Sequence, residues 1–147
     1  MVDFEAFKTL VERIKVEHPI WFGMESDSIP EQSDITEAEI NLGISLPTDY
    51  INFVSEYGGG YFAFSNVFSL EKRSDWNLVD LNNKYREIVS GHVLISENNL
   101  GDFYGFKITD GICGPEIYYY DHEVAQWQKS SYENLFEYLK VFAISRS

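Results

Sequence analysis

Histidine, cysteine and the acidic residues are the side chains of this sequence that can do chemistry, and their spacing decides which chemistry is open. The three histidines, His18, His92 and His122, lie far apart in the chain. Metal sites usually use close pairs such as H-x₃-H or C-x₂-C, and no such pair occurs. We therefore expect structural or exposed histidines, and we predict that the protein needs no metal and no other cofactor.

Covalent catalysis would need a nucleophile, and Cys113 is the single cysteine. It stands between two glycines in an expected hairpin turn, with no helix N-terminus to lower its pKa. The glycine run 58–60 is followed by aromatic residues instead of the Lys-Ser or Lys-Thr of a phosphate-binding loop, and the motif G-x-S-x-G is absent. The sequence therefore predicts a structural turn at the glycines and a protein that is not an enzyme.

Several carboxylates stand at expected strand ends or turns. A paired-carboxylate hydrolase needs two of them a few ångströms apart beside a cleft, and a sequence does not show such a distance. Asp110 precedes a glycine and suits a turn, whereas Asp102 follows a glycine and suits a hydrogen bond to the loop backbone. We interpret Asp121 and Glu123 as facing solvent or a protein partner.

Aromatic residues make up 16% of the chain, a fraction that suits both a core and a recognition surface. Trp76 and Trp127 each have two interpretations, as core packing between sheet and helix or as an anchor in a protein-binding surface. In the expected strand V-A-Q-W-Q, alternation places Trp127 on the same face as Ala125. The candidate partner-binding residues are Asp102, Tyr119, Asp121, Glu123 and Trp127.

The 147 residues carry 24 acidic and 11 basic side chains, a formal net charge of −13. Phosphate contacts need Lys and Arg, so the composition disfavours direct binding to nucleic acid. An acidic surface serves solubility, or it attracts a basic partner over long range. Both interpretations stay open at this point.

The chain shows no sign of export or of membrane insertion. One cysteine cannot form an intramolecular disulfide, which suits a reducing compartment. The segment M-V-D-F-E-A-F-K-T-L lacks the basic and apolar regions of a signal peptide, and no apolar run approaches the ~20 residues of a membrane span. We expect a cytoplasmic protein with one domain, residues 1–147, and no membrane contact.

The first half of the chain is expected to be helical. An apolar stripe predicts a helix over 3–17. Thr36 and Glu39 fit a capping box for a second helix, which Gly43 ends. Pro47 then opens a third helix, and Gly58, with an expected positive φ, ends it.

The second half predicts a meander of short strands with two further helices. The expected strands are 61–64, 67–70, 93–95, 103–108, 117–121 and 124–128. Ser65-Asn66 is the expected turn of the first hairpin, and Asp110-Gly111 is a strong hairpin dipeptide. The expected helices are 76–89, capped by Ser74 or Asp75, and one that follows a capping box of Ser130 and Glu133 and runs to about 144. This order predicts an α+β fold, a mostly antiparallel sheet with helices packed mainly on one face.

The ordered combination of motifs resembles the SUKH superfamily. The first part of the pattern is Ile35, Glu39, Leu42-Gly43, Leu46-Pro47, Tyr50, Phe53 and Gly58-Gly59. The second part is Gly101-Asp102, an aromatic strand, Gly114-Pro115-Glu116, the run I-Y-Y-Y-D-H-E, and a C-terminal helix with Phe136 and Leu139. The likeness covers residues 35–142. One departure is Tyr57 before Gly58, where relatives often have Asn, and it keeps the turn.

That superfamily includes fungal cell-wall synthesis regulators and many bacterial immunity proteins. For a bacterial chain, the resemblance implies an immunity protein, or antitoxin, that neutralises a secreted toxin, often a nuclease, by stoichiometric binding. The alternative is a non-catalytic regulatory scaffold related to the fungal regulators, whose long disordered flanks this chain almost lacks. An enzyme is the third possibility, and no constellation of residues favours it. A toxin gene beside this one would separate the first possibility from the other two.

Overall fold

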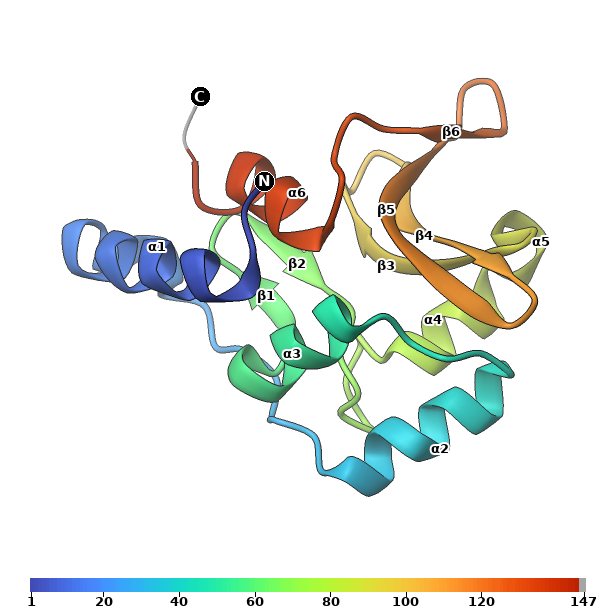
Figure 1. Ribbon diagram of the computed structural model, residues 1–147, viewed down its shortest axis with the longest axis horizontal. Helices are drawn as coiled ribbons and strands as arrows, with labels where there is room; N and C mark the ends of the chain where they lie inside the picture. Colours follow the sequence, from blue (N-terminus) through green and yellow to red (C-terminus); the bar gives the residue numbers. More distant parts are fainter. Residues whose placement is uncertain (146–147) are drawn as a thin grey trace.

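The computed structural model describes residues 1–145 as an alternation of helices and short strands (Figure 1). Its helical segments are α1 (Phe4–Glu17), the 3-10 turn η1 (Pro19–Phe22), α2 (Gln32–Leu42), α3 (Thr48–Tyr57), α4 (Leu78–Lys84), α5 (Arg86–Val89) and α6 (Leu135–Phe142). Its strands are β1 (Gly60–Phe62), β2 (Ser65–Val67), β3 (His92–Glu97), β4 (Phe103–Thr109), β5 (Ile112–Asp121) and β6 (Gln126–Lys129). This order confirms the α+β fold.

These strands pair antiparallel in two sheets. β1 and β2 form a hairpin, and β3, β4, β5 and β6 form a meander in that order, with β6 at its free edge. Phe68 N–H donates to the Ile95 carbonyl oxygen at 2.7 Å, directly after β2. The hairpin therefore lies beside β3.

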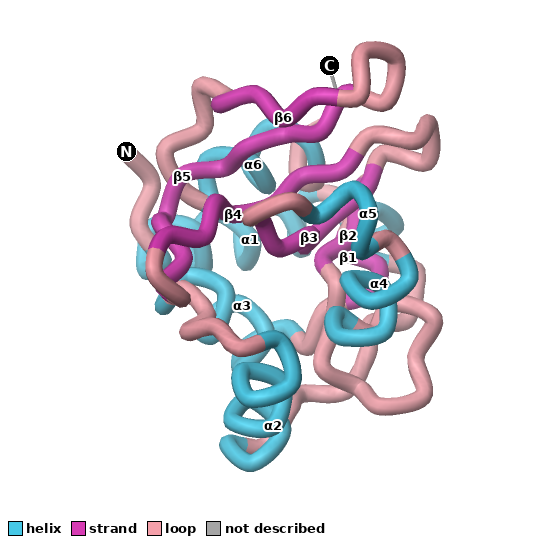
Figure 2. The backbone as a smooth tube through the Cα atoms, turned by 90° about the vertical axis from the view of Figure 1, so that its right-hand side faces the viewer, coloured by secondary structure: helices cyan, strands magenta, loops and turns pink. Residues whose placement is uncertain are grey.

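The helices lie mainly on one side of the meander, as expected. Figure 2 shows α1 and α6 behind the four strands and α3 below them, whereas α4 and α5 reach the opposite side near β3. Phe7 of α1 is fully buried at the centre of the helical side. Its ring centroid lies 5.0 Å from that of Phe136 in α6 and 6.3 Å from that of Phe53 in α3. Aromatic packing thus joins three helices that are distant in sequence.

The glycine run after α3 is a structural turn, as the sequence predicts. Gly58 has φ +82°, which confirms the expected positive φ. A Cβ on Gly58 would overlap the Asp27 carbonyl oxygen, because residues 26–28 cross the glycines at van der Waals distance. Asp27 N–H donates to the Gly59 carbonyl oxygen at 2.8 Å, and the Asp27 carboxylate accepts from Ser69 and Ser74. We call this contact the glycine seam.

The first hairpin turns two residues earlier than expected. Its turn residues are Ala63, with φ +49°, and Phe64 instead of Ser65-Asn66. Asn66 is buried and binds the neighbouring strand: its Nδ2 donates to the Glu97 carbonyl oxygen, and its Oδ1 accepts from Glu97 N–H, both at 3.0 Å. Because Asn66 lies in the strand, both its Nδ2 and its Oδ1 can bond to the Glu97 backbone, which a position in the turn would not allow.

Helix α2 begins a turn earlier than the expected capping box. Its N-cap is Glu31, whose backbone N–H donates to Asp34 Oδ2 at 2.9 Å. Thr36 therefore lies inside the helix. The Glu39 carboxylate, expected at the N-terminus, instead accepts from Leu46 N–H at 2.7 Å, past the end of the helix. Gly43, with φ +68°, ends α2 as predicted.

The helix expected over 76–89 is shorter and divided. Asn77 caps α4 in place of Ser74 or Asp75, and its Oδ1 accepts from Asp80 N–H at 3.0 Å. Tyr85 separates α4 from α5. Ser74 does not cap the helix, because its Oγ accepts a hydrogen bond from Trp76 N–H at 2.9 Å. Trp76 therefore precedes the helix instead of lying in it.

The last helix is capped by Asn134 instead of the expected Ser130 and Glu133. Asn134 Oδ1 accepts from Glu137 N–H at 2.9 Å. The Ser130 hydroxyl is already used, because it donates to the Ile117 carbonyl oxygen of β5. The box pattern in the sequence therefore marks a turn upstream of α6.

Candidate partner-binding surface

Four of the five candidate residues belong to the β5–β6 hairpin, and Asp102 directly precedes β4. Residues 122–125 form the hairpin turn, with Ala125 at φ +52°, so β6 begins later than expected. Tyr119 and Asp121 alternate onto one face of β5. Trp127 lies directly opposite Tyr120 in the ladder, and its side chain is therefore on the other face. The structure does not bring Trp127 together with the other candidates.

Trp127 closes the face of the sheet that it occupies. Its ring stacks on the His92 ring with centroids 4.1 Å apart, and its Nε1–H donates to the Ile88 carbonyl oxygen at 2.8 Å. His92 is in β3, and in a flat sheet three spacings of about 4.8 Å would put β3 roughly 14 Å from β6. The sheet therefore curls until its outer strands meet through these rings, which we call the Trp127–His92 closure. Burial lowers the pKa of His92, which favours the neutral ring.

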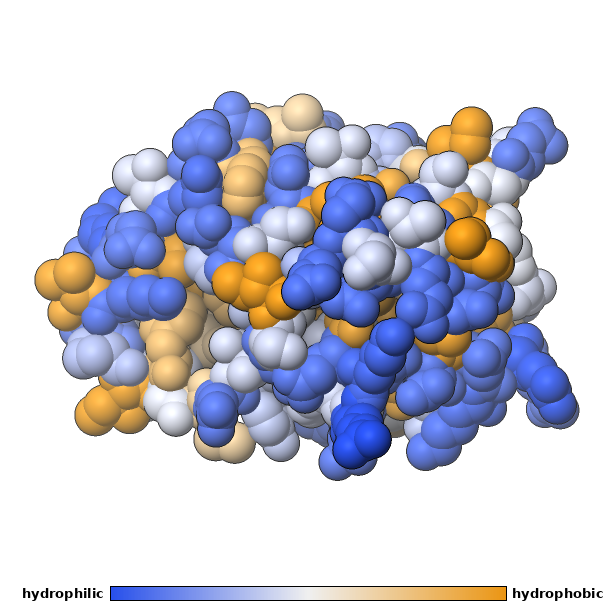
Figure 3. Space-filling view, turned by 90° about the horizontal axis from the view of Figure 1, so that it is seen from below, coloured by the Kyte–Doolittle hydropathy of each residue, from blue (hydrophilic) through white to orange (hydrophobic). Residues whose placement is uncertain are grey.

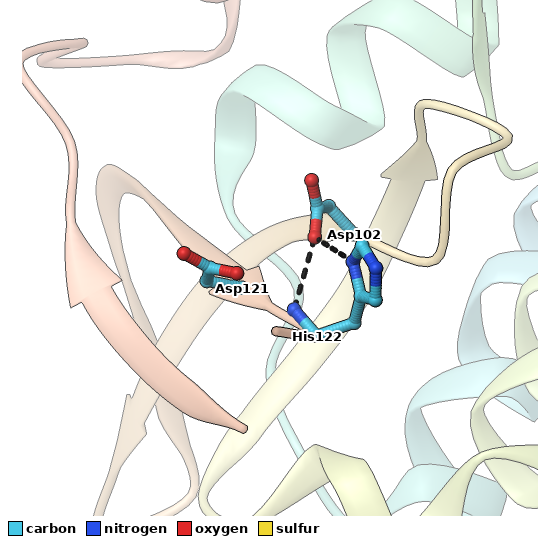
Figure 4. A group of neighbouring side chains, drawn as sticks. All are labelled: Asp102, Asp121 and His122. Carbon is cyan, nitrogen blue, oxygen red and sulfur yellow. Dashed lines mark hydrogen bonds and ion pairs between the residues drawn. The ribbon is translucent and has the colours of Figure 1, made fainter. Parts of the chain in front are cut away.

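On the opposite face, Asp102, Asp121 and His122 come together (Figure 4). One oxygen of Asp102, Oδ1, lies 2.6 Å from His122 Nδ1 and also accepts from His122 N–H at 3.0 Å. Asp102 therefore bonds loop backbone, as expected, and it also pairs with an imidazole. The hydrogen bond that the His122 ring donates to Asp102 raises the pKa of His122, and the bond from the His122 backbone N–H is the main cause that lowers the pKa of Asp102. We call these three residues the acidic cluster.

The acidic cluster is also the one group in residues 1–145 whose donor atoms lie close enough together to hold a metal, all within 4.8 Å of one another. As the residues stand, His122 Nδ1 and Asp102 Oδ1 are bonded to each other, so ligation would require that pair to open. Within residues 1–145, no hydroxyl or thiol side chain forms a hydrogen bond with His122. Cys113 is buried in β5, where burial raises the pKa of its thiol to about 11.

Beside this cluster lies an aromatic groove of about 380 Å³ that the sequence did not predict. Its aromatic walls and floor are Tyr61, Phe64, Trp76, Tyr104, Tyr138 and Phe142, and its polar side is Glu97, Asn98 and Asn99. Three of these rings are substantially exposed: Phe64 to 52%, Tyr61 to 42% and Phe142 to 37%. The lining contains no lysine or arginine.

The groove is positioned by elements from both ends of the fold. Tyr61 packs edge-on against Trp76 with centroids 5.3 Å apart, at the first hairpin. Tyr104 of β4 lies 4.6 Å from Tyr138 and 5.4 Å from Phe142, both on α6. The positive φ of Ala63 turns the hairpin so that Phe64 points outward, and the glycine seam, through Ser74, holds the backbone at Trp76.

The groove and the acidic cluster are continuous. Asn98 of the groove donates from Nδ2 to Asp102 Oδ2 at 2.9 Å. Tyr104 lies opposite Tyr119 in the ladder, with ring centroids 6.2 Å apart, and the Tyr119 hydroxyl donates to Gln128 Oε1 at 3.0 Å. Burial and the nearby Asp102 raise the pKa of Tyr104. Asp102, Tyr119 and Asp121 therefore border one surface, and Glu123 is exposed in the adjoining turn.

The surface around α2 differs from the groove in character. Around α2, hydrophilic side chains predominate and the hydrophobic ones form separate groups (Figure 3). Within residues 1–145, the carboxylates in ion pairs with lysine or arginine are those of Glu5, Glu17 and Glu37. Most of the 24 acidic residues therefore keep their charge uncompensated by a neighbour. None of the helices in residues 1–145 combines the length and the apolar character that a membrane crossing requires.

Comparisons with known proteins place the fold. A family model described as SMI1-KNR4 cell-wall, SUKH_6, matches residues 32–139. One of 17 matching chains of solved structures is described as a crystal structure of a protein from Pseudomonas syringae pv. tomato. It superposes with a TM-score of 0.70 at 12% identity, over 90% of this chain and 98% of the other. A search of curated proteins gives no significant match.

Proposed function

This chain belongs to the family described as SMI1-KNR4 cell-wall, and on that premise we propose that it is an immunity protein. It binds a bacterial toxin domain and silences it stoichiometrically, by covering the toxin's site. No catalysis and no cofactor enter this mechanism. The partner is a basic domain, and a nuclease (RNase or DNase) is the class that its expected charge favours.

One observation carries the proposal: an exposed aromatic groove runs into a cluster of carboxylates. Binding energy at protein interfaces concentrates in a few aromatic anchors seated in desolvated pockets, surrounded by a polar rim. Phe64, Tyr61 and Phe142 supply the exposed rings, and Asp102 with Asp121 supplies the rim. A surface of this composition suits recognition of a protein.

The charge supports a basic partner. A nuclease must carry Lys and Arg where it holds phosphate, and a chain with a net charge of −13 is attracted to such a surface. Long-range attraction of this kind raises association rates by roughly 10–10³-fold and weakens as salt screens it. The acidic cluster therefore sets how fast the partner arrives, and the aromatic groove sets how long it stays.

The test is co-expression with the toxin encoded beside this gene, followed by calorimetric titration of the purified pair. We expect protection of the cells, a 1:1 complex, and loss of both in the groove variant Phe64→Ala. Val16→Ala is the control, because Val16 is also an exposed apolar side chain but lies on α1, outside the groove. If the chain neither protects nor binds, the immunity function is wrong and the regulatory scaffold takes its place.

A further inference from the structure

We propose that the aromatic groove is a pocket for a cationic side chain, and that an arginine of the protein partner inserts into it. This inference deepens the proposed function by naming what the groove recognises. It rests on the groove as the partner site, but its chemistry can be tested without the partner.

The first support is the pairing of ring faces with a carboxylate. Cations are attracted to the faces of Trp, Tyr and Phe when they lie within about 6 Å of the ring centroid. The groove provides Tyr61, Phe64, Trp76 and Tyr104 around one cavity, with Glu97 on its polar side. An aromatic enclosure with a carboxylate at one wall selects positive charge over a neutral group of the same shape.

The second support is that the acceptors of the groove are unused. In residues 1–145, neither the Glu97 carboxylate nor the Asn99 side chain forms a hydrogen bond or an ion pair. The backbone of Glu97 is nevertheless held firmly, since both its N–H and its carbonyl oxygen are bonded to the buried Asn66 side chain. A fixed backbone thus presents a free carboxylate to whatever enters.

The third support is charge complementarity. The lining has one carboxylate and no lysine or arginine, and the acidic cluster adds further carboxylates at the adjoining rim through the bond from Asn98 to Asp102. A cation entering the groove therefore meets no repulsion from the groove lining. An anionic or phosphorylated side chain would meet Glu97 and then Asp102.

Arginine fits this groove better than lysine. Its guanidinium is planar, so it stacks on aromatic faces, and its five donors fork onto a carboxylate and neighbouring amide oxygens. It is also more weakly hydrated than an ammonium group, so it loses less on entering a half-closed cavity. Glu97 with Asn99 offers acceptors for the fork, and Trp76 with Tyr61 offers faces for the plane.

The experiment is an NMR titration of the whole chain with Nα-acetyl-argininamide, and with Nα-acetyl-citrullinamide as the neutral isostere. We expect the arginine probe at millimolar concentration to shift the indole signal of Trp76 and to leave that of Trp127 in place. The citrulline probe should bind ~5- to 10-fold more weakly, because it lacks the charge that cation–π contacts and charge-assisted bonds require.

Two glutamate variants sharpen the result. Glu97→Gln should reduce the affinity of the arginine probe to that of the citrulline probe, whereas Glu116→Gln, a carboxylate of β5 outside the groove, should leave it unchanged. Equal binding of the two probes, an unaltered Glu97→Gln variant, or shifts outside the groove would overturn the cationic pocket. If the cationic pocket is overturned but the chain still protects cells from the toxin, the immunity function stands. If the arginine probe binds but the chain gives no protection, only the pocket stands.

Discussion

Two tryptophans, Trp76 before α4 and Trp127 in β6, have opposite surroundings. Trp127 donates its indole N–H to the Ile88 carbonyl oxygen and stacks on His92, so its polar group and its ring face are both used within the chain. Trp76 packs edge-on with Tyr61 and forms no indole hydrogen bond within residues 1–145. Because no buried polar side-chain atom in that range lacks a partner, the indole nitrogen of Trp76 is accessible to solvent.

Unused hydrogen-bonding groups separate aromatic residues that stabilise the fold from those available for recognition. Both tryptophans are half-buried, so exposure alone does not distinguish them. The difference lies in what remains unsatisfied: the Trp127–His92 closure has no free donor, whereas the groove around Trp76 keeps a free indole N–H and a free carboxylate at Glu97. We expect stability to depend on the first region and binding on the second.

The largest effect on stability is expected at the glycine seam, which holds the backbone beside the groove. Gly58→Val should destabilise the fold by roughly 2–5 kcal/mol, because it adds a left-handed residue and a side chain that overlaps the Asp27 backbone. Gly43 also has a positive φ but no atom within 4 Å of its Cβ position, so Gly43→Ala should cost only about 1–2 kcal/mol. Urea denaturation of both variants measures the difference, and equal midpoints would show that residues 26–28 do not press on the glycines.

The next effect separates the tryptophans directly. Trp127→Ala should lower the free energy of unfolding by about 2–3 kcal/mol, less than the full cost of a buried tryptophan because the side chain is partly exposed. Partner affinity, measured on the folded fraction, should stay within a factor of two to three of the parent, on the order of 0.5 kcal/mol.

Trp76→Ala should do the reverse, with a stability loss of about 1 kcal/mol and a faster off-rate equivalent to about 2 kcal/mol or more of binding energy. Thermal unfolding and surface-binding kinetics on the same samples give the two quantities. A Trp127 variant that loses partner binding while folded would reverse the assignment of the two regions.

A smaller effect concerns the two histidines, whose pKa values shift in opposite directions. The ordinary histidine pKa is 6.5, and that of His122 is raised by Asp102 whereas that of His92 is lowered by burial. The His122–Asp102 pair therefore contributes stability fully below pH 6.5, which is lost as the pH rises through the raised pKa, and lost again as the pH falls through the lowered pKa of Asp102. His92 acts the other way, and its contribution is lost as the pH falls below 6.5.

An NMR titration of the histidine rings checks this expectation. In Asp102→Asn, the pKa of His122 should return toward 6.5 and that of His92 should not move. Identical titrations of the two rings in the parent protein would contradict the opposite environments.

The smallest effect is expected at the rim of the groove. Asp121→Ala should slow association with the basic partner by less than about tenfold at low salt and have almost no effect at high salt, because rim charges act mainly through steering. The off-rate should not change. Stopped-flow association at two ionic strengths tests this, with Asp110→Ala in the β4–β5 turn as a control carboxylate away from the groove. A slowdown that persists at high salt would make Asp121 a direct contact.

Much of the fold follows from local signals in the sequence. The apolar stripe of α1, the ends of α2 and α3 at Gly43 and Gly58, and the Asp110-Gly111 turn were all predicted correctly. Each depends on a few neighbouring residues with a fixed backbone preference. Caps were predicted less well, because Ser130 and Glu39 have the right side chains for a cap but bond to distant backbone groups instead.

The candidate surface depends on contacts that local patterns do not encode. Asp102 and Asp121 were chosen from their places at strand ends, and the meander brings them together through antiparallel register. Trp127 was grouped with them because strand alternation predicts which side of the sheet a side chain occupies, but not which other residues pack on that side. The groove was missed, since its walls come from the first hairpin, β4 and α6, and since Phe64 was assigned to a strand instead of an exposed turn. The high aromatic content was the only feature of the sequence that pointed to the groove.

The tie between α1 and α6 has a consequence for how the chain folds. Val2 N–H donates to Glu137 Oε1 and Asn134 Nδ2 donates to the Val2 carbonyl oxygen, across more than 130 positions of sequence. Together with the Phe7–Phe136 contact, these bonds complete the aromatic centre only when the last helix is present. Contacts of such high sequence separation slow the search for the native state. On the ribosome, α1 is made well before α6, and the part of its apolar stripe that Phe136 covers stays open until α6 emerges.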